Sequence, residues 1–137
     1  MSGRIKNIRK ANQLIDFAGL QLKEHIYPTD IDGLIEYNDS EYVLFEIKYK
    51  NSEVPKGQKL ALERMVNDFR KLGKEAIAIV CEHDTKDPEK PVIAADCRVR
   101  EVLTSGSEWN KPDSVMSLKD AIQMFQDKID NSEVTIS

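Results

Sequence analysis

Two acidic residues and a lysine in the first half of the chain have the types and spacing needed to hold a cation beside a phosphate. Glu46 and Lys48 lie in the run 42–49, which is the strongest strand pattern of the sequence. Successive side chains of a strand point to opposite faces, so Glu46 and Lys48 point the same way. Asp32 lies in the preceding apolar run, 31–37, which also reads as a strand. Carboxylates bind hard divalent cations, and a nearby lysine can stabilise charge on a phosphate.

The two runs are predicted to pair as an antiparallel hairpin around the turn-forming residues 38–40. A loop of these three residues places Asp32 directly opposite Glu46. Opposed residues have Cβ atoms about 5 Å apart, so the two carboxylates could share one cation. Without a cation they would repel each other. Asp30 is the competing candidate, and this register favours Asp32.

Each of the two short motifs has an ordinary explanation when it is taken singly. A Glu-x-Lys sequence in a strand is most often an exposed edge, and Asp-Gly is most often a turn signal. The combination is more specific, because turn chemistry does not explain an aspartate inside an apolar run. We therefore treat Asp32, Glu46 and Lys48 as a candidate site.

Gln58 is the polar member of an otherwise apolar helix face. That helix is predicted to end at Gly73, and its apolar positions are Ala61, Leu62, Met65, Phe69 and Leu72. An amide that points toward a sheet needs a partner, so Gln58 is expected to reach a ligand carboxylate, the metal's water or a phosphate. The alternative is a frayed first turn that leaves Gln58 in water.

These residues resemble a known family. Asp32, followed by Glu46-Ile47-Lys48 on the next strand, resembles the hairpin motif of the PD-(D/E)XK nuclease superfamily. The stretch from Pro55 to Arg64 looks like the glutamine-bearing helix of many members, above all small exonuclease, recombination-type and phage-encoded ones. The chain departs from the family in one place, since 28–32 reads Pro-Thr-Asp-Ile-Asp instead of a Pro-Asp dipeptide.

The resemblance implies a role for each candidate residue. The side chains of Asp32 and Glu46, with the carbonyl of Ile47, would hold Mg²⁺ or Mn²⁺. Lys48 would orient the metal's water or stabilise the transition state, and Gln58 would assist. A carboxylate at the end of the first helix, Glu24, is a possible additional ligand next to His25, although a solvated helix end is the commoner explanation of both residues.

The order of the remaining elements predicts an α/β fold. The resemblance makes it a three-layer, restriction-endonuclease-like core of the αββαβ(β) type, a mixed sheet flanked by helices with an extra C-terminal helix. The expected elements are a helix over 8–22, the strands 31–37 and 42–49, a helix over 58–72, a buried central strand over 76–81, a strand from 92 to 99 running on toward 103, and a last helix that begins at Ser117 and ends in a frayed tail, 131–137.

Length and composition are those of one soluble domain, 1–137, without a membrane span or a secretory signal, so we expect a cytoplasmic protein. The net charge of −4 is unusual for a DNA-binding protein, but the first ten residues are basic and the last part is acidic. Cys81 and Cys97 lie in apolar runs and are expected to be buried thiols, because their spacing matches no zinc motif.

The sequence thus predicts a magnesium-dependent deoxyribonuclease that recognises DNA structure more than DNA sequence. Two alternatives stay open. One is a catalytically inactive module of the same fold that binds nucleic acid or protein. The other is a structural partner in a larger assembly. The final helix either covers the sheet or forms a homodimer.

Overall fold

A four-stranded mixed sheet lies at the centre of the molecule, in the order β1–β2–β3–β4. The computed structural model describes residues 16–21, 23, 26 and 28–136. The strands are β1 (Gly33–Tyr37), β2 (Glu41–Tyr49), β3 (Glu75–His83) and β4 (Arg98–Leu103). The two outer pairs are antiparallel and the central pair, β2 with β3, is parallel. The expected α/β fold around a mixed sheet is therefore confirmed.

The hairpin of β1 and β2 has the register expected from the sequence. Tyr37 pairs with Glu41, and Gly33 pairs with Phe45. The loop between the strands has positive φ angles at Asn38 and Asp39, 52° and 54°, which asparagine and aspartate tolerate better than most residues. The turn composition therefore fixes the register that determines which side chains face each other.

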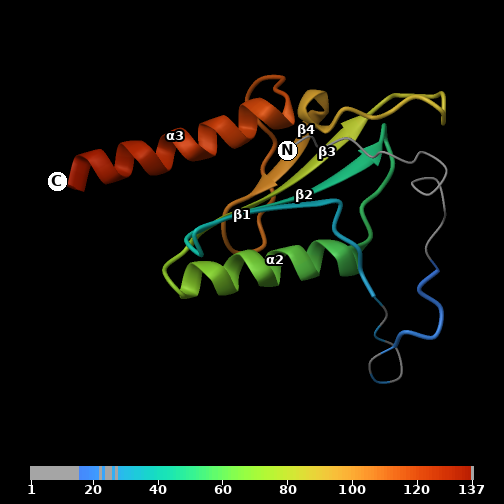
Figure 1. Ribbon diagram of the computed structural model, residues 1–137, viewed down its shortest axis with the longest axis horizontal. Coiled ribbons are helices and arrows are strands. Elements are labelled where there is room, and N and C mark those ends of the chain that lie inside the picture. The colour runs from blue at the N-terminus through green and yellow to red at the C-terminus, as the bar shows by residue number, and fades with distance from the viewer. Residues whose placement is uncertain (1–15, 22, 24–25, 27, 137) are drawn as a thin grey trace.

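Two helices cover opposite faces of the sheet, as Figure 1 shows. Helix α2 (Lys56–Lys71) forms the crossover between the parallel strands β2 and β3 and packs its buried Leu62 and Val66 against one face. Helix α3 (Leu118–Ile136) packs Leu118, Ala121, Phe125 and Ile129 against the other face. Strand β3 is therefore buried on both sides, as its continuous apolar run predicts.

Helix α3 begins as predicted but ends later. The Asp120 amide donates a hydrogen bond of 3.1 Å to Ser117 Oγ, so Ser117 is the N-cap. The helix continues to Ile136, however, and the expectation of a frayed tail from residue 131 is wrong. The residues of α3 that pack on the sheet include Ile129, and the helix continues past them to Ile136.

The prediction of a first helix over 8–22 is wrong where the structure tests it. The segment 16–21 is not helical. Asp16 Oδ1 accepts a hydrogen bond from the Ala18 amide, and Gly19 has a φ of 85°. The aspartate side chain thus satisfies a backbone donor that a helix would have used, and the glycine turns the chain. The rest of the expected helix lies outside the described residues.

Two strand boundaries also differ from the prediction. Strand β1 begins at Gly33, so Ile31 and Asp32 precede it. The segment 92–97 is not a strand, because Ala94–Asp96 forms a short 3₁₀ helix, η1, before β4 begins at Arg98. Val92 and Ile93 are exposed there. Their apolar side chains give the sequence pattern of a strand, but in the described structure this segment does not pair with a strand.

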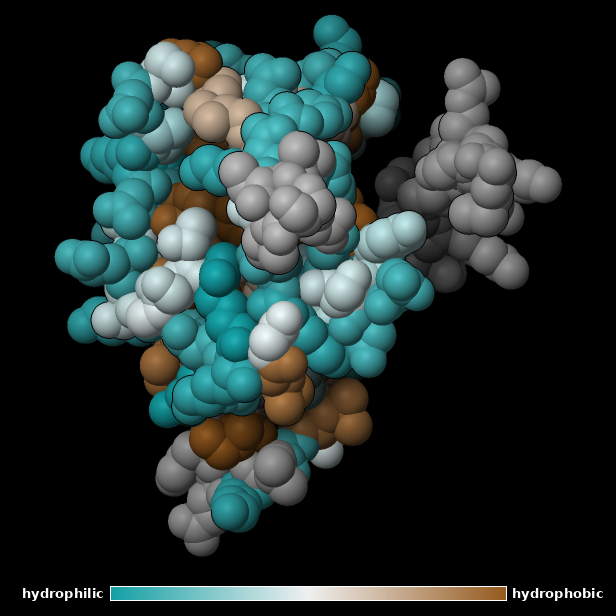
Figure 2. Space-filling view, turned by 90° about the vertical axis from the view of Figure 1, so that its left-hand side faces the viewer, coloured by the Kyte–Doolittle hydropathy of each residue, from teal (hydrophilic) through white to brown (hydrophobic). Residues whose placement is uncertain are grey.

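The described part of the chain has no helix both long and apolar enough to cross a membrane. Figure 2 shows the end of the molecule that carries the hairpin turn and the last turns of α3, where hydrophilic side chains prevail and hydrophobic ones form separate patches. The opposite end, where β2 and β3 finish and α2 begins, carries the candidate site (Figure 1).

Candidate metal centre

The sequence-predicted residues Asp32, Glu46, Lys48 and Gln58, here called the acidic site, come together where β2 meets the first turn of α2. Glu46 and Lys48 lie on the face of β2 that α2 covers, because they alternate with residues of the opposite face. Gln58 reaches the same region from α2, and its Nε2 donates a hydrogen bond of 3.1 Å to the Asp30 carbonyl. The hairpin and the helix therefore position the acidic site together.

Asp32 is fixed by the backbone of the neighbouring strand. Its Oδ2 accepts a hydrogen bond of 2.7 Å from the Ile47 amide. In the predicted register, the Ile47 amide would have bonded to Ile31. The Asp32 side chain takes this amide instead, so β1 begins only at Gly33. Asp32 is exposed, and its carboxylate also lies next to that of Glu46.

Glu46 is a buried carboxylate with an incomplete set of partners. Only 2 % of the residue is exposed, and among the described residues its Oε2 has no hydrogen-bond donor. The nearest cation is Lys48, whose Nζ lies 3.6 Å from Oε1, beyond ordinary hydrogen-bond length. A buried carboxylate with a bare oxygen is costly, and such atoms call for an explanation.

The surroundings of Glu46 raise its pKa from 4.5 to about 7. Burial is the largest cause, followed by the negative charge of Asp32 and hydrogen bonding to the Asp32 carboxylate. Lys48 acts in the opposite direction but does not offset these causes. A cation bound beside Glu46 would lower the pKa of Glu46 again, because a nearby positive charge favours the ionised carboxylate.

Gln58 supplies a second unpartnered acceptor. The residue is 7 % exposed, so the alternative of a frayed helix start that leaves it in water is wrong. Its Nε2 is used by Asp30, whereas its Oε1 has no donor among the described residues. Gln58 thus has a buried acceptor without a donor and is held beside the Asp30 backbone, two residues before Asp32.

The residues present fit a magnesium-like ion with few protein ligands. In the part of the chain that the structure describes, no group of three or more histidine, cysteine, aspartate and glutamate residues could hold a metal. Mg²⁺ is usually held by one or two carboxylates and keeps several waters, so the pair Asp32 and Glu46 is sufficient. N–H and C=O of one strand residue point to the same edge, so the Ile47 carbonyl faces the side where Asp32 lies.

A charged cluster beside the acidic site was not foreseen from the sequence. Glu82 of β3 is the ladder partner of Lys48 and is 9 % exposed. It forms ion pairs with Arg98 and Arg100, the second at 3.1 Å from Nε to Oε1. The signal in the sequence was a glutamate that directly follows the apolar run 76–81, a position where a charge must have partners.

The other candidate residues lie apart from the acidic site or outside the residues that the structure describes. Glu24, His25 and the basic residues of the first ten positions lie outside the described residues. Cys81 and Cys97 are buried thiols, as expected. Burial raises the pKa of the Cys81 thiol to about 12, so this thiol stays protonated at neutral pH. Trp109 covers the core, and its Nε1 donates to Glu63 Oε2 over 3.1 Å.

No family model matches the chain, and neither the curated proteins nor the solved structures give a significant match. What the acidic site can do must therefore be inferred from its own residues.

Proposed function

We propose that the chain is a nuclease that uses Mg²⁺ or Mn²⁺ to hydrolyse phosphodiester bonds of DNA at the acidic site. The observation that carries the proposal is the buried Oε2 of Glu46, which has no donor among the described residues and lies beside a second carboxylate, Asp32. A structural carboxylate would be paired or exposed. An acceptor left bare beside another acceptor is instead typical of a site that binds a cation.

In this proposal Asp32 and Glu46 hold the cation, and the Ile47 carbonyl is a third ligand. When bound, the cation lowers the pKa of a coordinated water and offsets charge on phosphate oxygens. The hydrogen bond from the Ile47 amide keeps the Asp32 carboxylate oriented, so this ligand is fixed before the cation binds. Burial keeps water from competing for Glu46.

Lys48 and Gln58 act on the substrate, and Gln58 also holds the Asp30 backbone in place. The Lys48 side chain is 25 % exposed and its ammonium is 3.6 Å from Glu46, so it can turn toward a phosphate or a nucleophilic water. The Oε1 atom of Gln58 can accept a hydrogen bond from that water. The N-terminus of α2 at the same place favours an anion such as phosphate.

The finer description of the fold belongs to the same proposal. The order β1–β2–α2–β3, with the acidic site on the hairpin and the first turn of α2, supports a restriction-endonuclease-like core of the PD-(D/E)XK type. The resemblance also implies products with 5′-phosphate ends. Cleavage directed by DNA structure more than by DNA sequence is part of the same proposal.

Cleavage of a mixed DNA panel tests the proposal. Linear duplex, branched and single-stranded DNA are incubated with the full chain in Mg²⁺, in Mn²⁺ and in EDTA. We expect cleavage only with a divalent cation. An inactive binding module would retard the same DNA in a gel without cutting it, and a structural partner would do neither.

The variant Lys48→Ala sharpens the test, because an ammonium that acts on the transition state is not needed to bind DNA or the cation. We expect the rate of cleavage to fall more than about tenfold, which corresponds to about 1.4 kcal/mol in the barrier. Lys71→Ala, at the exposed far end of α2, is the matched control and should cut like wild type. Equal rates for the two variants would remove Lys48 from the mechanism.

A further inference from the structure

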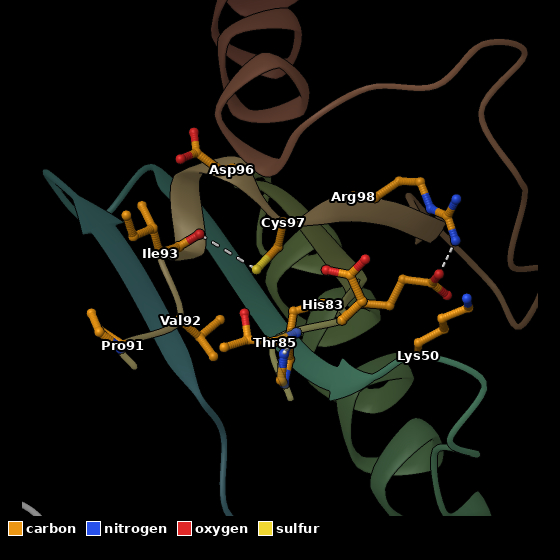
Figure 3. Close-up of a pocket in the computed structure, with 11 residues that line it drawn as sticks. Lys50, His83, Thr85, Pro91, Val92, Ile93, Asp96, Cys97 and Arg98 are labelled. Atoms are coloured by element: carbon orange, nitrogen blue, oxygen red, sulfur yellow. Dashed lines mark hydrogen bonds and ion pairs between the residues drawn. The ribbon is translucent and has the colours of Figure 1, made fainter. Parts of the chain in front are cut away.

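A cleft of about 460 Å³ opens next to the acidic site, at the end of the sheet where β3 finishes and η1 precedes β4. Figure 3 shows its two unlike sides. Pro91, Val92 and Ile93 form an apolar wall on one side, and Lys50 and Arg98 lie on the other. His83 and Thr85 lie between the two walls.

Two lining residues of the cleft, Lys50 and Glu82, are neighbours of Lys48. Lys50 follows Lys48 by two residues, a distance of about 7 Å along an extended chain. Its amide donates a hydrogen bond of 2.7 Å to the His83 carbonyl, which holds Lys50 at the mouth of the cleft. Glu82, the ladder partner of Lys48, also lines the cleft. A ligand bound at Lys48 would therefore extend into the cleft with its next unit.

The lining carries three carboxylates, Glu82, Asp84 and Asp96, and two cationic side chains, Lys50 and Arg98. Glu82 is neutralised by its ion pairs with Arg98 and Arg100. Lys50 has no ion pair with any described residue within 4.0 Å, so it can take an anionic ligand. Asp96 points away from the other labelled side chains in Figure 3. Lys50 is thus the lining cation that can take an anion, and it lies across the cleft from the apolar wall.

Uncharged polar groups complete the lining. His83 Nδ1 accepts a hydrogen bond of 3.2 Å from the Thr85 amide, so the neutral ring carries its proton on Nε2 and can donate there. The Thr85 hydroxyl can both donate and accept. An apolar wall, a few polar groups and a cation at the mouth match a nucleotide, which has a flat base, polar base edges and a phosphate.

Resting on the proposed function, we infer that this cleft binds the nucleotide next to the cleaved bond, with its base unpaired. The volume lies at the small end of the range of ligand pockets, about 300–1,000 Å³, so one base fits but a base pair does not. Drawing a paired base into the cleft would cost a few kcal/mol of unstacking and unpairing. The substrate is therefore a single-stranded tail, a flap or a frayed end.

Binding is tested first, apart from cleavage. The full ¹⁵N-labelled chain is titrated in EDTA with the mononucleotide dAMP, and the amide resonances of the lining are followed. We expect shifts at Lys50, Val92 and Ile93. Val92→Trp, which fills the cleft from a half-exposed position, should weaken dAMP binding at least about tenfold, or about 1.4 kcal/mol. The control Val115→Trp, at an 84 % exposed position outside the cleft, should bind like wild type.

Cleavage is then measured in Mg²⁺ on a duplex with a single-stranded tail and on the same duplex with blunt ends. We expect the tailed substrate to be cut at least about tenfold faster, and Val92→Trp but not Val115→Trp to lose this preference. Absence of dAMP shifts at the cleft would overturn the inference, as would a preference that Val92→Trp leaves intact. Binding of dAMP at the cleft without cleavage of any DNA would support the nucleotide site and contradict the proposal that the chain is a nuclease.

Discussion

At the scale of single residues, the acidic site is defined by what Glu46 lacks. Its carboxylate is buried, its Oε2 has no donor among the described residues, and its nearest ammonium is 3.6 Å away. Each of these features lowers stability when no cation is present, because a buried charge without partners is poorly solvated. A protein keeps such a residue where function needs it, as strained sites commonly do.

The raised pKa of Glu46 makes stability depend on pH in a definite direction. Its pKa is 4.5 in the reference state and about 7 in the fold, so the folded chain binds more protons between these values. In EDTA, this contribution to stability is complete below about pH 4.5 and is lost as pH rises through 7. The loss is on the order of 3 kcal/mol, because the pKa rises from 4.5 to about 7 and one pKa unit corresponds to about 1.4 kcal/mol.

Urea unfolding at several pH values in EDTA measures this effect. We expect Glu46→Gln to remove the decline between pH 5 and 8 and to be more stable than wild type at pH 8. Glu89→Gln, at an exposed position, should keep the wild-type profile. Parallel profiles for wild type and Glu46→Gln would mean that Glu46 titrates normally.

Gln58 should matter less than the carboxylates, because an uncharged amide positions a ligand but cannot replace one. We expect Gln58→Ala to cut DNA at a rate between wild type and Asp32→Asn. The variant also removes the hydrogen bond to the Asp30 carbonyl, so melting must be measured in parallel. A single-turnover rate equal to wild type would exclude a role for Gln58 in the reaction.

At the scale of elements, the hairpin positions the site through a close contact between Gly33 and Phe45. A Cβ atom added at Gly33 would lie 1.9 Å from Phe45 Cζ, so the ring covers the glycine directly. The two residues are ladder partners, and Asp32 immediately precedes the glycine. The ring therefore holds the start of β1 against β2 and sets the place where Asp32 can reach the Ile47 amide.

Gly33→Ala should displace the ring and destabilise the fold by about 1–3 kcal/mol, the usual cost of overpacking. Metal affinity should fall as well, because Asp32 moves with the backbone. The double variant Gly33→Ala/Phe45→Leu should recover part of the stability, since the smaller side chain leaves room for the methyl group. Chemical unfolding of Gly33→Ala, Phe45→Leu and the double variant measures this. If the loss of stability in the double variant equals the sum of the two single losses, the contact with Phe45 is not the cause.

Most elements could be predicted because their residues carry a local pattern. The turn at 38–40 fixed the hairpin register, and the spacing of apolar residues located α2 and the start of α3. The errors arose where a side chain bonds to the backbone or where strand pairing fails. Asp16 bonds to the Ala18 amide, and Val92 and Ile93 have no strand to pair with. Neither circumstance is visible in hydrophobic periodicity.

At the scale of the molecule, the sheet brings the candidate site residues to one end. Strands β2 and β3 are parallel and finish at the same edge, and the first turn of α2 lies there too (Figure 1). The sequence predicted that Asp32, Glu46 and Lys48 would meet, because one hairpin register decides it. It could not predict Glu82 with its two arginines, or the cleft beyond them, because these depend on how β4 and η1 pack against β3.

We propose that Asp32 and Glu46 together bind a divalent cation. The melting temperature with and without Mg²⁺ is a direct test of this binding. A cation at ten times its dissociation constant adds about 1.4 kcal/mol to stability, which raises the melting temperature by roughly 4 °C for a domain of this size. Asp32→Asn keeps an acceptor for the Ile47 amide but removes one negative charge. It should melt higher than wild type in EDTA and respond little to Mg²⁺.

Asp30→Asn is the matched control, because Asp30 contacts Gln58 through its backbone carbonyl, which the substitution leaves in place. If Asp32 and Glu46 bind the cation, Mg²⁺ raises the melting temperature of wild type and of Asp30→Asn and leaves that of Asp32→Asn almost unchanged. The contradicting result is a wild-type melting temperature that does not change even at tens of millimolar Mg²⁺, or a response lost in Asp30→Asn and kept in Asp32→Asn.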